Sequence, residues 1–256
     1  DDTVMVAAMA VNNEIGVIQE LAAIGEICAQ RDVHFFVDGA QAPGRMRLDV
    51  ESMAITAMSL TAHKCYGPKG AGALFVRRED VPIQPLIVGG GQEFGLRSGT
   101  LATHQIVGLG ASLQRCERLY DEDEARILEL RNVLLAGLRA ALPELRVNGC
   151  EIHRASGNLN VVIPGADANT LMVALPDLAI SSGSACSTGA TKPSHVLSAL
   201  GVPAEDAFCS IRFGVGRFNT RADIDLAVTR VAEEAKRLRA ASPLWQMRQA
   251  GVKLNW

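Results

Sequence analysis

The N-terminal part of the chain alternates between short apolar runs typical of strands and a segment with the period of a helix. The strand-like runs are 3–11, 33–41, 52–60 and 71–78, and the helix-like segment is 18–31. Apolar strands that alternate with helices are typical of a largely parallel sheet covered by helices. We therefore predict an α/β fold, in which ligands bind at the carboxyl ends of the strands.

The C-terminal part has a different character. A Gly-rich loop at 85–100 leads into one long helical pattern, which Pro143 ends. The shorter segments that follow predict a second, smaller α+β domain. We expect residues 1–115 to form part of the large domain and residues 116–256 to form the small domain. Its expected strands are 158–165, 178–186 and 209–218, and its expected helices are 169–175, capped by Asn169, 194–201 and 222–241.

The composition excludes several kinds of protein. The net charge of −3 and the lack of a long block of one sign argue against a surface for nucleic acid. No apolar run reaches the roughly 18 residues that a membrane helix needs, and the chain opens without the basic segment of a signal peptide. The six cysteines are scattered without a CxxC pair, which favours neither a disulfide framework nor a zinc site. We expect a protein of a reducing compartment, without a metal site and without contacts to nucleic acid or membrane.

Lys64 stands directly after His63, just past a strand-like run and before a turn rich in glycine and proline. A lysine in a turn is most often a solvated surface charge. Here, however, Thr61 and His63 can donate hydrogen bonds to a phosphate group, and Asp38 ends the preceding strand with Gln41 close behind it. A pyridoxal-phosphate enzyme needs a lysine that bonds to the cofactor and a carboxylate that keeps the pyridine nitrogen protonated. The pattern D-x-x-Q followed by T-x-H-K therefore indicates a site for this cofactor.

A series of sequence blocks allows a more specific comparison. They are VNNEIG, VDGAQAPG, SLTAHKCYGPKG, GGGQEFGLRSGT, SSGSACSTG, KPSHVLSALG, SIRFGVGRF and SPLW. From Asp1 to Trp256 and in the order found in the family, they resemble the cysteine desulfurases that supply sulfur for iron–sulfur clusters. The resemblance implies a fold-type I, aminotransferase-like large domain, truncated at its N-terminus, followed by a smaller C-terminal domain.

The resemblance also implies roles for the residues around Lys64. Lys64 would hold pyridoxal 5'-phosphate covalently and take the α-proton of the substrate. Asp38 would pair with the pyridine nitrogen, and Gln41 would form a hydrogen bond with the ring hydroxyl. Thr61 and His63 would bind the phosphate group.

Three further residues receive roles from the same resemblance. Thr100 would reach the phosphate from the other subunit of a homodimer. Asn13 would lie beside the ring oxygen and the substrate. Arg212 would bind the substrate carboxylate, a task that suits a planar, bidentate donor.

The cysteines are expected to differ in function. A free cysteine is commonly a small buried hydrophobe, and this description fits Cys28 and Cys209 better than Cys186, which lies in the polar, Gly-bearing stretch 181–191. The resemblance implies that the Cys186 thiolate takes the sulfur of L-cysteine as a persulfide, leaves L-alanine, and passes the sulfur to an iron–sulfur scaffold protein or another acceptor. Cys65, beside the cofactor lysine, is expected to pack, with its side chain directed away from that of the lysine.

The sequence departs from the family pattern at several positions without losing a catalytic group. Gly39 replaces the usual alanine, Ala62 the usual glycine, and Phe94 stands where many relatives have arginine. Lys192 reverses a charge after the reactive cysteine.

A larger departure is the lack of the N-terminal part of the family, with its second phosphate-binding loop and ring-stacking histidine. The chain enters a strand-like run directly after Asp2, so we expect it to begin inside a domain and its sheet to expose an edge and apolar faces. A non-catalytic assembly subunit or fragment is therefore one alternative function, and a related lyase such as a selenocysteine lyase is another. The expected compartment is the cytoplasm, or the mitochondrial matrix in a eukaryote.

Overall fold

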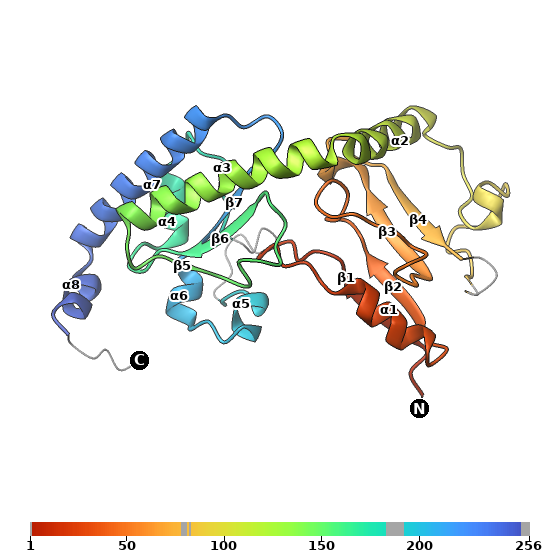
Figure 1. The fold of residues 1–256 in the computed structure, drawn as a ribbon, viewed down its shortest axis with the longest axis horizontal. Helices are drawn as coiled ribbons and strands as arrows, with labels where there is room; N and C mark the ends of the chain where they lie inside the picture. The colour runs from red at the N-terminus through yellow and green to blue at the C-terminus, as the bar shows by residue number, and fades with distance from the viewer. Residues whose placement is uncertain (1, 78–80, 82, 183–191, 252–256) are drawn as a thin grey trace. The chain divides into compact units, whose positions relative to one another are not determined.

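The computed structural model describes residues 2–77, 81, 83–182 and 192–251 (Figure 1). The chain divides into two compact units. The first consists of Asp1–Asn12 and Ile18–Asp123, and the second of Asn13–Val17 and Glu124–Trp256. The short segment Asn13–Val17 therefore folds with the second unit, although both of its chain neighbours belong to the first.

The first unit is built on a four-stranded sheet. Its strands, in order across the sheet, are β1 (Met5–Met9), β2 (His34–Asp38), β3 (Ala57–Thr61) and β4 (Gly72–Val76). The first three are parallel, and β4 is antiparallel to β3. The mainly parallel sheet predicted from the sequence is confirmed, although β3 is shorter than expected because turns occupy residues 50–54.

One face of this sheet is largely exposed. Successive side chains of a strand point to opposite faces. Phe35 and Val37 point to one face and are fully buried, whereas Met5 and Leu74 on the other face are 55% and 53% exposed. Within the described residues, β1 and β4 each pair with a strand on one side only. The exposed edge and apolar face expected from the sequence are therefore confirmed.

Two helices and two short turns complete the first unit. They are α1 (Leu21–Ala29), α2 (Thr103–Arg118), and the 3-10 turns η1 (Ala62–Lys64) and η2 (Glu93–Gly95). The single long helix expected up to Pro143 is wrong. The chain leaves helical geometry at Leu119, with φ −100° and ψ 8°, before α3 (Tyr120–Ala141) begins.

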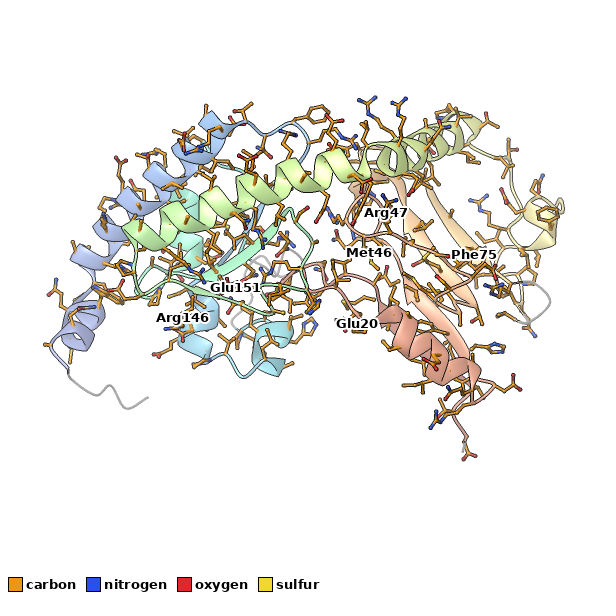
Figure 2. All side chains as sticks on the ribbon, in the orientation of Figure 1. Glu20, Met46, Arg47, Phe75, Arg146 and Glu151 are labelled. Carbon is orange, nitrogen blue, oxygen red and sulfur yellow. The ribbon has the colours of Figure 1, made fainter. Side chains whose placement is uncertain are left out.

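Arg47 stabilises the junction between α2 and α3. Its guanidinium group binds Glu117 at 3.0 Å and Asp121 at 2.8 Å, one acid on each side of the break. Figure 2 labels Arg47. The guanidinium group also lies 4.7 Å from the centroid of the Tyr120 ring. These contacts come from a residue about seventy positions away, so the helical pattern itself could not reveal them.

The second unit contains a three-stranded antiparallel sheet and several helices (Figure 1). The strands are β5 (Arg146–Val147), β6 (Asn158–Val162) and β7 (Ser210–Gly214), and besides most of α3 the helices are α4 (Ala168–Ala174), α5 (His195–Ala199), α6 (Ala204–Phe208), α7 (Arg221–Ala241) and α8 (Pro243–Gln249). This arrangement agrees with the smaller α+β domain predicted from the sequence.

Two local predictions for this unit are wrong. The part of 178–186 that the structure describes forms only an isolated bridge between Ser181 and Arg212, not a strand. The cap of α4 is Asp167 rather than Asn169, since the Asp167 carboxylate accepts a hydrogen bond from the backbone N–H of Thr170 at 2.8 Å. Asp167 binds the Thr170 hydroxyl as well, which explains why the helix starts earlier than expected.

Helices α3 and α7 bury apolar side chains against the sheet of the second unit. Leu134 and Leu138 of α3 are one helical turn apart, and both lie in the same cluster as Ile211 of β7 and Val231 of α7. The start of α7 is fixed by a capping box between Thr220 and Asp223. No helix among the described residues is both long and apolar enough to cross a membrane.

Trp245 anchors α8 to the second unit. The Arg239 guanidinium lies 4.2 Å from the centroid of the indole ring, and donates a hydrogen bond to the Pro164 carbonyl at 2.8 Å. Next to Pro164, Gly165 has a φ of +79°, and a Cβ atom at this position would overlap the indole. Only glycine therefore fits both the backbone conformation and the space beside Trp245.

We expect Leu138→Ala to lower the free energy of unfolding of the second unit by about 2–5 kcal/mol, because it leaves a cavity in the core. Ile152→Ala is the matched control, since Ile152 is 84% exposed, and should change stability by less than about 0.5 kcal/mol. Urea unfolding followed by circular dichroism measures both variants. Equal losses in the two variants would contradict the assigned core.

Candidate active site

Polar side chains gather where two neighbouring parallel strands end. Asp38 is the last residue of β2 and Thr61 the last residue of β3. Asp38 lies opposite Ser59 in the register, so that Asp38, Ser59 and Thr61 occupy the same face of the sheet. The carboxyl ends of parallel strands are where ligands bind in such sheets.

The turn η1 carries Lys64 immediately beyond β3. The Ala62 carbonyl accepts hydrogen bonds from the backbone N–H groups of Cys65 at 3.0 Å and Gly67 at 2.9 Å, which closes the turn. Ala62, in place of the usual glycine, is fully buried under it. The side chains of His63 and Lys64 remain exposed and accessible to a ligand.

The Thr61 hydroxyl and the His63 ring stand next to each other. The Thr61 Oγ1 and His63 Nδ1 atoms are 2.9 Å apart, within hydrogen-bond distance. Both groups can donate a hydrogen bond, and both adjoin the exposed lysine. Such a pair can bind an anionic group, as the sequence predicted for the phosphate of the cofactor.

One carboxylate oxygen of Asp38 accepts hydrogen bonds from neighbouring residues, and the other is available to a ligand. Its Oδ1 atom accepts hydrogen bonds from the Ala40 N–H at 2.9 Å and from the Ser59 hydroxyl at 3.5 Å. Its Oδ2 atom has no hydrogen-bond partner among the residues that the structure describes. The carboxylate can therefore accept a hydrogen bond from a protonated ring nitrogen.

Because Gly39 has no side chain, the backbone directly after β2 can pass close to β3. A Cβ atom at position 39 would lie 2.9 Å from the Ser59 carbonyl oxygen and 3.0 Å from Met58 Cγ. Alanine, the usual residue here, would require the neighbouring strand to shift. This departure from the family pattern thus has a steric cause in the chain itself.

Arg45 and Ser59 are two site residues that the sequence did not predict. Arg45 donates hydrogen bonds to the side-chain oxygen and to the backbone carbonyl of Gln41. With that oxygen occupied, the Gln41 side-chain amide is left as a donor, which suits a ring hydroxyl. The spacing of four residues between Gln41 and Arg45, and the alternation that places Ser59 beside Asp38, were available signs.

Cys65 packs inward. It is 2% exposed, and its sulfur lies 3.2 Å from the Ala62 carbonyl and 3.5 Å from the Ser112 hydroxyl of α2. The Lys64 side chain is exposed and the Cys65 side chain is buried, so the two point in different directions, as expected for adjacent residues. The structure supports packing rather than reactivity for this thiol.

Thr100 lies at the end of the Gly-rich loop and is exposed. The loop is held internally, since the buried Ser98 hydroxyl accepts a hydrogen bond from the Gly91 N–H at 3.3 Å. Phe94 in the same loop is 80% exposed and has a positive φ of 58°. The contact of Thr100 with a cofactor in a second subunit stays a prediction.

In the second unit, Arg212 and Asn13 are brought together. An Arg212 side-chain nitrogen, Nη1, donates a hydrogen bond to the Asn13 carbonyl oxygen at 2.7 Å. The Arg212 backbone is also held on both sides, by Asn160 of β6 and by Ser181. The other nitrogens of the guanidinium group have no hydrogen-bond partner among the described residues, so they can bind a carboxylate.

Cys186 lies outside the described residues, and the remaining described thiols differ in exposure. Cys28, Cys65 and Cys116 are buried. Burial raises the pKa of the half-buried Cys209 thiol. Cys150 is exposed, and hydrogen bonds from the backbone N–H groups of His153 and Ile152 lower the pKa of its thiol. Within the described residues, no cluster of His, Cys, Asp and Glu side chains could hold a metal ion.

We expect Cys150 to react with iodoacetamide faster than the other described thiols. Because the pKa of Cys150 is lowered, its thiolate should persist at a pH below the ordinary thiol range, whereas Cys209 should require a higher pH. Mass spectrometry of peptides after timed labelling between about pH 6 and 9 measures the rates. Faster labelling of Cys209 than of Cys150 at the low end of this range would contradict the assignment.

Comparisons with known proteins agree on one family. The family model of class-V aminotransferases matches residues 1–227. A cysteine desulfurase IscS from Tolumonas auensis is 49% identical over 255 residues, which are 99% of this chain and 63% of that protein. A cysteine desulfurase IscS from Vibrio cholerae is 48% identical over 256 residues, again 63% of its length. The chain thus spans less than two thirds of the curated relatives that it matches.

A solved structure described as a NifS-like protein has the same fold. It superimposes on 93% of this chain with a TM-score of 0.84 and 30% sequence identity, and the match covers 62% of that chain. Similarity in sequence and in structure thus extends over both units.

Proposed function

The chain belongs to the class-V aminotransferase family, and on that basis we propose that it forms the larger part of a cysteine desulfurase. The protein would remove sulfur from L-cysteine, release L-alanine and hold the sulfur as a persulfide on Cys186. The 49% identity with a cysteine desulfurase over 99% of the chain is the observation that carries this proposal. The arrangement of Asp38, Thr61, His63 and Lys64 around adjacent strand ends supports it.

Pyridoxal 5'-phosphate fits the residues at these strand ends. The Oδ2 atom of Asp38 can keep the pyridine nitrogen protonated, the Gln41 amide can donate to the ring hydroxyl, and Thr61 with His63 can bind the phosphate. The exposed Lys64 amine would bond to the aldehyde carbon. When bound, the cofactor supplies an electron sink for the electrons of the substrate Cα–H bond.

The residues of the chain would divide the remaining work. Arg212 would hold the substrate carboxylate, with Asn13 beside it, and the Lys64 amine would move the proton at Cα. The Cys186 thiolate would attack the substrate sulfur. The new S–S bond forms as the Cβ–S bond breaks, and the carbon fragment keeps that electron pair, takes up a proton and leaves as L-alanine. One cysteine thiol and one L-cysteine thus give one persulfide and one L-alanine, and the atoms balance.

The same proposal covers partners and compartment. Thr100 would complete the phosphate site of a second subunit, so that the protein would act as a homodimer. An iron–sulfur scaffold protein or another thiol would accept the sulfur from Cys186. The six scattered cysteines favour a reducing compartment, which we take to be the cytoplasm, or the mitochondrial matrix in a eukaryote.

A non-catalytic assembly subunit is the second candidate function. The exposed sheet face with Met5 and Leu74 offers an apolar surface to another polypeptide. A protein of this kind would bind no cofactor and would be colourless, whereas the enzyme would be yellow. A selenocysteine lyase would be yellow too, and an assay of alanine released from L-cysteine and from L-selenocysteine distinguishes it.

We expect Lys64→Ala to remove the visible absorbance of the cofactor and to lower turnover of L-cysteine by about 10³-fold or more, because the covalent attachment and the proton carrier are both lost. The natural polypeptide that carries this chain is the protein to use. Lys69→Ala, a change to an exposed lysine of the same loop, is the control and should retain both properties. Normal turnover in Lys64→Ala would rule out this enzyme mechanism.

We expect Cys186→Ser to retain the cofactor absorbance but to lose the persulfide, since serine cannot hold the sulfur atom. Mass spectrometry after incubation with L-cysteine should show a gain of one sulfur in the wild-type protein and none in the variant. Cys150→Ser, which removes the exposed thiol of the second unit, should still gain sulfur. Sulfur transfer that survives in Cys186→Ser would assign the persulfide to another residue.

A further inference from the structure

Glu14, in the segment Asn13–Val17, is held through both its backbone and its side chain, yet neither the sequence pattern nor the proposed reaction gives it a role. It is 3% exposed. Its backbone carbonyl accepts hydrogen bonds from the side-chain amides of both Asn158 and Asn160, each at 3.2 Å. Asn158 and Asn160 are two residues apart on β6, so that their side chains lie on the same face of the sheet.

The Glu14 side chain is fixed by a second, directional contact. The Ser194 hydroxyl donates a hydrogen bond to the Glu14 Oε2 atom at 2.7 Å. The same hydroxyl oxygen accepts hydrogen bonds from the backbone N–H groups of Val196 and Leu197, which caps α5. A serine hydroxyl has a single hydrogen to donate, and in Ser194 the carboxylate of Glu14 accepts it.

The peptide group before Glu14 connects this anchor to Arg212. The carbonyl oxygen that accepts the 2.7 Å hydrogen bond from Arg212 belongs to Asn13, in the planar peptide group that joins Asn13 to Glu14. Two consecutive peptide groups around Glu14 are thus bound to β6 and β7. A movement of Glu14 would move the acceptor that orients the guanidinium group.

We propose that Glu14 is a positioning residue, which holds the Asn13 carbonyl so that Arg212 presents its remaining N–H donors to a carboxylate ligand. This inference rests on the proposed function, since it assigns the carboxylate to the amino-acid substrate. Preorganisation of this kind strengthens binding because the guanidinium group needs no reordering when the ligand arrives. The contribution should be specific to ligands that carry a carboxylate.

The experiment compares L-cysteine with cysteamine, which has the same amine and thiol but no carboxylate. Both are titrated into the cofactor-loaded natural polypeptide in a Cys186→Ser background, where sulfur removal is blocked, and the change in cofactor absorbance gives the dissociation constants. Glu14→Ala should weaken binding of L-cysteine by about tenfold, on the scale of a hydrogen bond to a charged group, and change binding of cysteamine by less than about twofold. Glu14→Gln retains an oxygen that can accept from Ser194 and should lie closer to the wild type.

Ser194→Ala tests the same anchor from its other end and should resemble Glu14→Ala. The controls are Ser198→Ala, on the exposed side of α5, and Glu20→Ala, an exposed acid before α1 (Figure 2). In the cofactor-free protein, amide hydrogen exchange at Val196 and Leu197 should become faster in Glu14→Ala and Ser194→Ala and remain unchanged in the controls.

The outcomes separate this inference from the proposed function. If the background protein binds neither ligand, the proposed function fails, and with it the substrate that the inference assigns to Arg212. If the background protein prefers L-cysteine and Glu14→Ala weakens both ligands equally, or neither, then Glu14 does not position Arg212 and the inference alone is wrong.

Discussion

The parallel pairing of β2 with β3 is the constraint on which the candidate site depends. The pairing places Asp38 beside Ser59. Because β3 ends at Thr61 and η1 follows directly, the pairing also places the turn with Lys64 near the end of β2. A slip of one residue would turn the Asp38 carboxylate to the opposite face of the sheet. The buried side chains of β2, Phe35 and Val37, fix the register and so determine the face on which the Asp38 carboxylate lies, although they take no part in the reaction themselves.

Much of this arrangement could be predicted from the sequence, because it is local. Asp38 ends an apolar run, and Lys64 follows another such run within a short turn, so strand ends and turn residues indicate the site. The parallel sheet followed from the alternation of strand and helix patterns. What periodicity could not give was the break at Leu119, since Arg47, which stabilises it, comes from a distant part of the chain.

Competition between similar residues limited other predictions. Asp167 and Asn169 are both good helix caps, and the choice between them depends on the position of Thr170. The segment that begins at Leu178 resembles a strand, but within the described residues it meets β7 only at the bridge between Ser181 and Arg212. The contact of Glu14 with Ser194 joins residues separated by 180 positions, a distance that no single sequence discloses.

The close fit of Gly165 against Trp245 has a consequence for how this protein can evolve. Any side chain at position 165 would overlap the indole, so the position can change only after Trp245 has been replaced by something smaller. Replacing Trp245 first would remove the ring on which Arg239 stacks. Each order of substitution passes through a weakened intermediate, so these positions should vary together in descendants of the chain or not at all.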